Sequence, residues 1–165
     1  MKRFLSLFLL LALLCCLTAC KQKETMEDPV TFYYQNKEFS HGSGNSVILG
    51  ETRESTSSED IISLLNLYLK GPVSENLLKT FPNGTKLLKF HIDGEIANVV
   101  LSDQITLADG IELTVACGCL AKTVIELTGV TGVNICAENL PLGNKQNIYM
   151  DLNSLLLLDI STVAS

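Results

Sequence analysis

Positive charge is scarce in this chain. Its 165 residues include 12 Lys or Arg and 18 Asp or Glu, which gives a formal net charge of −6 at pH 7. A protein that binds nucleic acid needs a basic face for the phosphates, and a helix held electrostatically on a membrane needs one for anionic lipids. The composition therefore argues against nucleic acid as a partner and against such a helix.

A membrane-spanning run is also lacking. The apolar segment 4–16 is shorter than the roughly 20 apolar residues of a transmembrane helix, and the charged Lys21 and Lys23 follow it. Lys2 and Arg3 precede it, and small residues end it, which is the order of an export signal. The segment is expected to be removed or embedded in the membrane, and it does not belong to a folded core.

The end of this signal resembles the bacterial lipobox. Its residues are Leu17-Thr18-Ala19-Cys20, and the resemblance implies cleavage before Cys20 and acylation of its thiol and amine. Several acyl chains together make a stable anchor, whereas one holds a protein only marginally. The chain then divides into a lipoprotein signal peptide, 1–19, the lipidated Cys20 with a short tether, 20–29, and one domain, 30–165. The alternative is a plain secretory signal that ends in cysteine.

Three of the six cysteines would remain in the domain: Cys117, Cys119 and Cys136. Two residues two positions apart on a helix point about 200° apart, which suits a zinc site poorly. Outside the cytoplasm, a disulfide between Cys136 and either Cys117 or Cys119 is possible. The alternative places Cys117 in the core as a small hydrophobic residue and Cys119 at its edge. The sequence does not decide between a disulfide and cysteines that pack in and beside the core.

Catalytic signatures are absent from the sequence. His41 lies in a polar segment and His91 in an expected strand, and no nucleophile elbow or HExxH motif accompanies them. Asp93, Glu95 and Asp103 fall at turns and strand ends, where carboxylates are normally solvated and unsuited to glycan cleavage. We therefore expect no catalytic residue, no metal ligand and no cofactor, and predict that the protein is not an enzyme.

Periodicity and turn residues predict an α+β fold. Ser57 or Ser58 is expected to cap the first helix, Gly71-Pro72 to end it, and Asp93-Gly94 to form a two-residue hairpin loop. The segment 74–80 could add a turn of helix. Expected strands cover 30–34, 47–54, 86–92, 95–102, 132–137 and 147–152, with helices near 61–69 and 111–127. The order ββαββαββ predicts a mixed, mainly antiparallel sheet with both helices packed on one face.

An ordered set of residues across 30–150 resembles the GerMN domain, a sporulation and spore-germination module of bacterial envelope lipoproteins. The matching residues are Leu67-x-x-Lys70-Gly71-Pro72, Pro82-x-Gly84-Thr85-x-Leu87-Leu88, Gly94, Ala97, Val99, Leu101, Ser102, Glu126-Leu127-Thr128 and Gly129-Val130-x-Gly132-Val133. Two segments depart from the family pattern. Asn98-Val99-Val100 replaces a usual Val-Asp-Leu run, and Cys117-Gly118-Cys119 lies in a helix that normally lacks cysteine.

The resemblance implies a non-catalytic interaction module on the extracytoplasmic face of the cell membrane, anchored through Cys20. Its expected partner is another envelope or sporulation protein or a second copy of the chain, and its expected role is in sporulation, germination or envelope assembly. A lipoprotein that binds a small ligand or peptidoglycan is the alternative. A cell-wall enzyme is a third reading, for which the sequence offers no cluster of polar residues.

Overall fold

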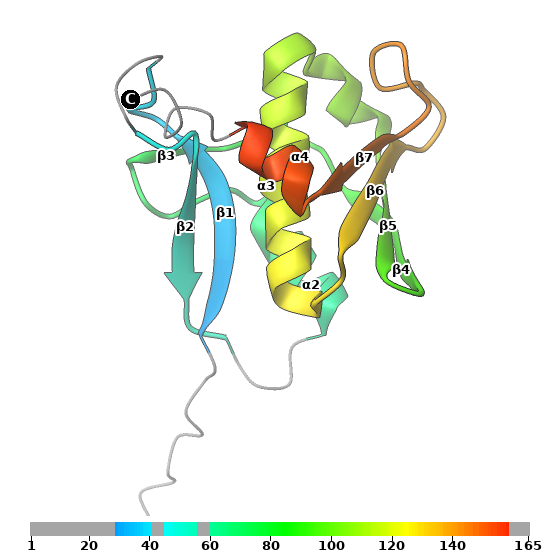
Figure 1. Cartoon of the computed structure of the whole chain (residues 1–165). Coiled ribbons are helices and arrows are strands. Elements are labelled where there is room, and N and C mark those ends of the chain that lie inside the picture. Colours follow the sequence, from blue (N-terminus) through cyan, green and yellow to red (C-terminus); the bar gives the residue numbers. More distant parts are fainter. Residues whose placement is uncertain (1–28, 41–44, 56–59, 159–165) are drawn as a thin grey trace, which may run out of the picture.

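The computed structural model describes residues 29–40, 45–55 and 60–158 of the chain (Figure 1). No helix within these ranges is both long and apolar enough to cross a membrane. The elements are β1 (Val30–Asn36), β2 (Ile48–Arg53), α2 (Ile61–Leu69), β3 (Leu77–Leu78), β4 (Leu87–Asp93), β5 (Ile96–Leu101), the 3-10 helix η1 (Asp103–Leu107), α3 (Gly110–Thr128), β6 (Gly132–Ala137), β7 (Ile148–Asp151) and α4 (Leu152–Leu158).

The α+β class with mainly antiparallel strands is confirmed. The described strands form two sheets, one with the order β2-β1-β3 and one with the order β4-β5-β6-β7. Every pair is antiparallel except β5 with β6, which runs parallel. A parallel pair needs a crossover connection, and η1 and α3 supply it.

The expected single sheet with two helices on one face is therefore wrong in its layering. Helix α3 packs against β1 of one sheet and against β6 and β7 of the other, so it lies between the two sheets (Figure 1). The backbone N–H of Tyr33 in β1 donates to Oγ1 of Thr123 in α3 at 2.9 Å. Because α3 occupies this edge of β1, the strands cannot join into one continuous sheet.

Helix α3 is buried on more than one side because it separates the sheets. Leu113, Cys117, Leu120 and Val124 recur at helical spacing along one side of α3, and they lie in the main core with 5% exposure or less. A second, smaller cluster covers another side of the helix, and its buried members are Val47, Ile48, Val115 and Cys119. A helix with a single core-facing stripe would not bury this second set.

Aromatic rings fill the space between β1 and α2. The ring of Tyr68 stacks on that of Tyr34 at 4.9 Å between centroids and meets Phe81 edge-on at 6.3 Å. The hydroxyl of Tyr34 donates to the backbone carbonyl of Tyr68 at 3.0 Å. Burial removes the rings from water, and the hydrogen bond satisfies the buried hydroxyl.

Two local expectations near α2 are wrong. The carboxylate of Asp60 caps this helix by accepting from the backbone N–H of Ser63 at 2.7 Å, whereas Ser57 and Ser58 lie outside the described residues. Segment 74–80, where a further helical turn was considered possible, contains instead the short strand β3, which pairs with the end of β1. Tertiary pairing with an available strand edge overrides local helix propensity here.

The predicted hairpin is confirmed, with its loop displaced by one residue. Asp93 pairs with Ile96, so the two loop residues are Gly94 and Glu95. Gly94 has φ +59°, and no non-glycine residue described has positive φ, which matches a turn with glycine at the first central position. The apolar segment after the last strand forms α4, which packs on α3.

Candidate functional site

Cys117 and Cys119 are both buried thiols on opposite sides of α3. Cys117 belongs to the main core and Cys119 to the second cluster, and each has no exposed surface. Burial raises the pKa of Cys117 to about 12 and raises the pKa of Cys119 further. Thiols that stay protonated are poor nucleophiles and poor metal ligands. The alternative to a disulfide therefore places Cys117 correctly in the core, whereas Cys119 is buried in the second cluster and does not lie at the edge.

Cys136 lies away from both. It projects from β6 on the face opposite to α3, and its Sγ is 3.8 Å from the carbonyl oxygen of Val99. Burial raises the pKa of its thiol as well. All three cysteines are free thiols in the structure, which therefore does not form the disulfide considered between Cys136 and Cys117 or Cys119.

The histidines and carboxylates considered for catalysis are not gathered in one buried site among the described residues. His91 and Asp93 are exposed on β4, Glu95 is exposed in the hairpin loop, and His41 lies outside the described residues. Within the described ranges, no three His, Cys, Asp or Glu side chains come together to hold a metal ion. The described residues among them are therefore not arranged as a catalytic group.

Asp103 fixes one loop of the domain. Its carboxylate accepts from the backbone N–H of Asn139 at 2.9 Å, from the Asn139 side-chain amide at 3.0 Å, and from the backbone N–H of Leu140 at 3.3 Å. The bonds from Asn139 hold the pKa of this carboxyl below its usual value. The carboxylate thus ties the first residue of η1 to the loop that follows β6.

Arg53 and Glu51 form a half-buried ion pair with a structural role. The guanidinium of Arg53 also donates to the carbonyl of Gly71 at 2.8 Å and lies 5.1 Å from the ring centroid of Phe32. The carboxylate of Glu51 accepts from the backbone N–H of Ser74 at 2.7 Å. Both side chains use their polar atoms to hold the segment that follows α2, which explains why a charged pair occupies a β-strand.

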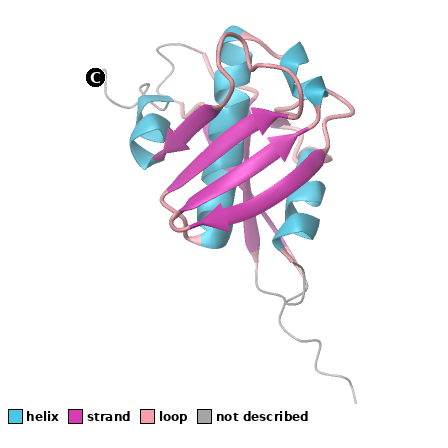
Figure 2. Ribbon diagram, turned by 90° about the vertical axis from the view of Figure 1, so that its right-hand side faces the viewer, coloured by secondary structure: helices cyan, strands magenta, loops and turns pink. Residues whose placement is uncertain are grey.

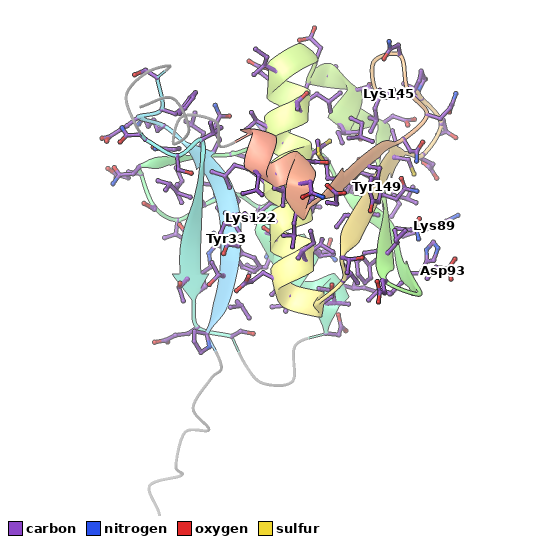
Figure 3. The ribbon with its side chains drawn as sticks, in the orientation of Figure 1. Tyr33, Lys89, Asp93, Lys122, Lys145 and Tyr149 are labelled. Atoms are coloured by element: carbon purple, nitrogen blue, oxygen red, sulfur yellow. The ribbon has the colours of Figure 1, made fainter. Side chains whose placement is uncertain are left out.

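The outer face of the four-stranded sheet is uncovered. We define it as the side of the sheet that faces away from α3 (Figure 2). Lys89 and Asp93 project from it in Figure 3. The strand registers place these residues on it: Lys89, His91, Asp93, Ile96, Asn98, Val100, Gly132, Asn134, Cys136, Tyr149 and Asp151. Among them only Gly132 is buried.

Three asparagines form a row across this face. The amide nitrogen of Asn134 donates to Oδ1 of Asn98 at 3.3 Å, and the amide nitrogen of Asn147 donates to Oδ1 of Asn134. Beside the row, Tyr149 lies over Gly132, where a β-carbon would stand 2.8 Å from ring atoms Cε2 and Cζ of the tyrosine. This arrangement is not predicted from the sequence above, although the alternation of buried and polar residues in β5 and β6 could have indicated it.

A second exposed surface is apolar. Leu107 at the end of η1 and Ile111 in the first turn of α3 are each 77% exposed. We call this pair the apolar end. The start of α3 lies at the top of the domain in Figure 1, whereas β1 begins at the bottom. The two surfaces and the fold define a small α+β module with a helix between two sheets.

The chain belongs to the Germane family, the family of GerMN domains, described as "Sporulation and spore germination". The family model matches residues 31–143, more than half of the chain. This family is a non-catalytic type of domain. A search of the curated proteins finds no match.

Solved GerMN structures show the same fold. The tandem GerMN domains of the sporulation protein GerM from Bacillus subtilis match with 20% identity and a TM-score of 0.55, over 78% of this chain and 45% of that one. This chain therefore spans less than half of that structure. The first GerMN domain of the same protein matches with 17% identity and a TM-score of 0.54, over 74% and 96%. A candidate lipoprotein from Clostridium perfringens has 20% identity and a TM-score of 0.46, over 81% and 93%.

Proposed function

We propose that this chain is a lipid-anchored protein of the bacterial envelope whose domain binds another envelope protein, in sporulation, germination or envelope assembly. The signal peptide, 1–19, and Cys20 support the anchor, and family membership supports the setting. The tether, 20–29, spans about 35 Å at most when fully extended. The domain, 30–165, is thus held close to the extracytoplasmic face of the membrane.

The position of the apolar end carries the proposed interaction. Leu107 and Ile111 lie beside the first turn of α3, whereas β1, which follows the tether, begins near the other end of that helix (Figure 1). A helix of 19 residues is about 28 Å long, so the apolar end lies at the end of the domain opposite to the start of β1. Exposed apolar side chains at such a place suit a protein partner better than the lipid surface that holds the chain.

In-cell photo-crosslinking tests the interaction. A photoreactive amino acid at position 111 should give a discrete protein adduct. The same residue at position 62, where Ile62 is 49% exposed on α2, serves as the matched control. Adducts at both positions, or at neither, would remove the support for a partner at the apolar end.

Fractionation tests the anchor separately. Cys20→Ala should move the protein from the membrane fraction to the soluble fraction, because the acylated thiol is lost. Lys21→Ala, one residue away, is the control and should leave the protein with the membrane. A Cys20→Ala variant that stays in the membrane fraction would show that the lipid anchor is wrong.

A further inference from the structure

We propose that the outer face of the four-stranded sheet binds a glycan with N-acetylated sugar rings. This inference goes beyond the proposed protein interaction and uses a surface other than the apolar end. It rests on two neighbouring features: the ring of Tyr149 and the row of Asn98, Asn134 and Asn147.

Tyr149 provides a stacking platform. The position of Gly132 under the ring lets the tyrosine lie down on the backbone of β6, since a β-carbon there would occupy the space of the ring. The side chain is still 48% exposed, and Ile96, 37% exposed, is the partner of Gly132 in β5. A flat, apolar ring surface of this kind suits the C–H face of a pyranose ring.

The asparagine row supplies hydrogen bonds beside the platform. Asn98 accepts from Asn134 through its oxygen, and Asn147 donates to Asn134 through its nitrogen. Within the described ranges, no further bond is made by the amide nitrogen of Asn98 or by the side-chain oxygen of Asn147. The row therefore presents donors at one end and an acceptor at the other. An acetamido group has one donor and one acceptor of its own.

The dimensions of the row fit a short stretch of glycan. The row crosses from β5 over β6 to the start of β7, at about 4.8 Å for each strand, so its ends lie about 10 Å apart, roughly the length of two linked pyranose rings. Lys89 on β4 is exposed and projects from this face, as Asp93 does (Figure 3).

A protein sheet packed on this face would be a poorer occupant. The core of a protein interface is apolar, and burying the amide row under apolar side chains would leave its hydrogen-bonding groups without partners. The hydroxyl and acetamido groups of a sugar can instead form hydrogen bonds with these amides in place of water. The acidic balance of the whole chain makes a nucleic acid unsuitable, although its bases could stack on a tyrosine.

Equilibrium dialysis tests the proposal with the full-length lipidated protein in detergent. The probe is the hexamer of N-acetylglucosamine, and the glucose hexamer, which lacks acetamido groups, is the comparison. We expect the acetylated hexamer to bind and the glucose hexamer to bind at least several-fold more weakly. No binding of the acetylated hexamer at millimolar concentration, or equal binding of both, would overturn the proposal.

Variants locate the site. Tyr149→Ala and Asn134→Ala should each weaken binding about tenfold, and Tyr149→Phe, which keeps the ring, should change it by no more than about twofold. Asn153→Ala, an exposed asparagine on α4, is the matched control and should bind normally. Thermal midpoints confirm that each variant is folded. Unchanged binding in Tyr149→Ala and Asn134→Ala would show that the glycan does not use this face.

A photoreactive residue at position 91 distinguishes a protein partner on this face from a glycan. His91 is exposed on the same face and pairs with Asn98. A protein adduct formed there in cells, and not reduced by excess acetylated hexamer, would overturn the glycan proposal in favour of a protein partner. The apolar-end interaction is tested at position 111 and can fail or succeed independently.

Discussion

Thr123 offers a direct test of why the domain has two sheets. Its side chain is fully buried in α3, and its Oγ1 accepts the backbone N–H of Tyr33 in β1 at 2.9 Å. Valine has the same shape but no acceptor. Thr123→Val would therefore leave the Tyr33 N–H unpaired between helix and strand, at a cost of about 2 kcal/mol. Thr123→Ser keeps the acceptor and loses one methyl group, so its cost should be about 1 kcal/mol.

Urea unfolding followed by far-ultraviolet circular dichroism measures both variants. The midpoint should fall further for Thr123→Val than for Thr123→Ser, with an unchanged dependence on urea concentration. Amide exchange gives a local measurement: the Tyr33 N–H should exchange about 30-fold faster in Thr123→Val, which corresponds to about 2 kcal/mol. If Thr123→Val were as stable as the unchanged protein, or less damaging than Thr123→Ser, the hydrogen bond would not explain how α3 holds the edge of β1.

Three further results are expected. Burial raises the pKa of both Cys117, to about 12, and Cys119, so the folded state keeps protons that the unfolded state loses at high pH. The free energy of unfolding should be constant below pH 8 and should fall as the pH rises through 9 toward 12. Urea midpoints measured against pH should show a less steep fall in Cys117→Ala. An equally steep fall in Cys117→Ala and in the unchanged protein would show that Cys117 does not contribute to this pH dependence. Asp103→Ala should speed amide exchange at Asn139 while leaving the N–H of Leu120 protected, and unchanged exchange at Asn139 would show that the carboxylate does not fix the loop. Gly94→Ala should destabilise the hairpin by about 1 kcal/mol because φ is +59°, and an unchanged thermal midpoint would exclude the assigned turn.

Much of the fold could be predicted from residues close together in the chain. Strand β6 begins and ends where its β-branched residues and flanking glycine indicate, and the Asp-Gly dipeptide identified the hairpin to within one residue. The helical spacing of Leu113, Leu120 and Val124 identified the core-facing side of α3. These patterns depend on periods of two or 3.6 residues, which a single segment displays by itself.

The candidate surfaces could not be found in this way. The row of Asn98, Asn134 and Asn147 exists because β5 and β6 pair in parallel and β7 pairs antiparallel beside them. The register between those strands is set by the packing of their other faces on α3. Taken one at a time, Asn98 and Asn134 are ordinary half-exposed strand residues and Asn147 is an exposed residue before β7. The contact between Tyr149 and Gly132 likewise depends on the pairing of β6 with β7.

By itself, the sequence determined the α+β class, the resemblance to GerMN domains, and the expectation of an exported, lipidated chain, because each depends on local composition or on residues in order. The tertiary structure decided that α3 lies between two sheets, that Cys117 and Cys119 face opposite cores as free thiols, and which polar residues share the outer face. Those outcomes depend on how segments far apart in the chain satisfy one another's hydrogen bonds and bury one another's apolar surface.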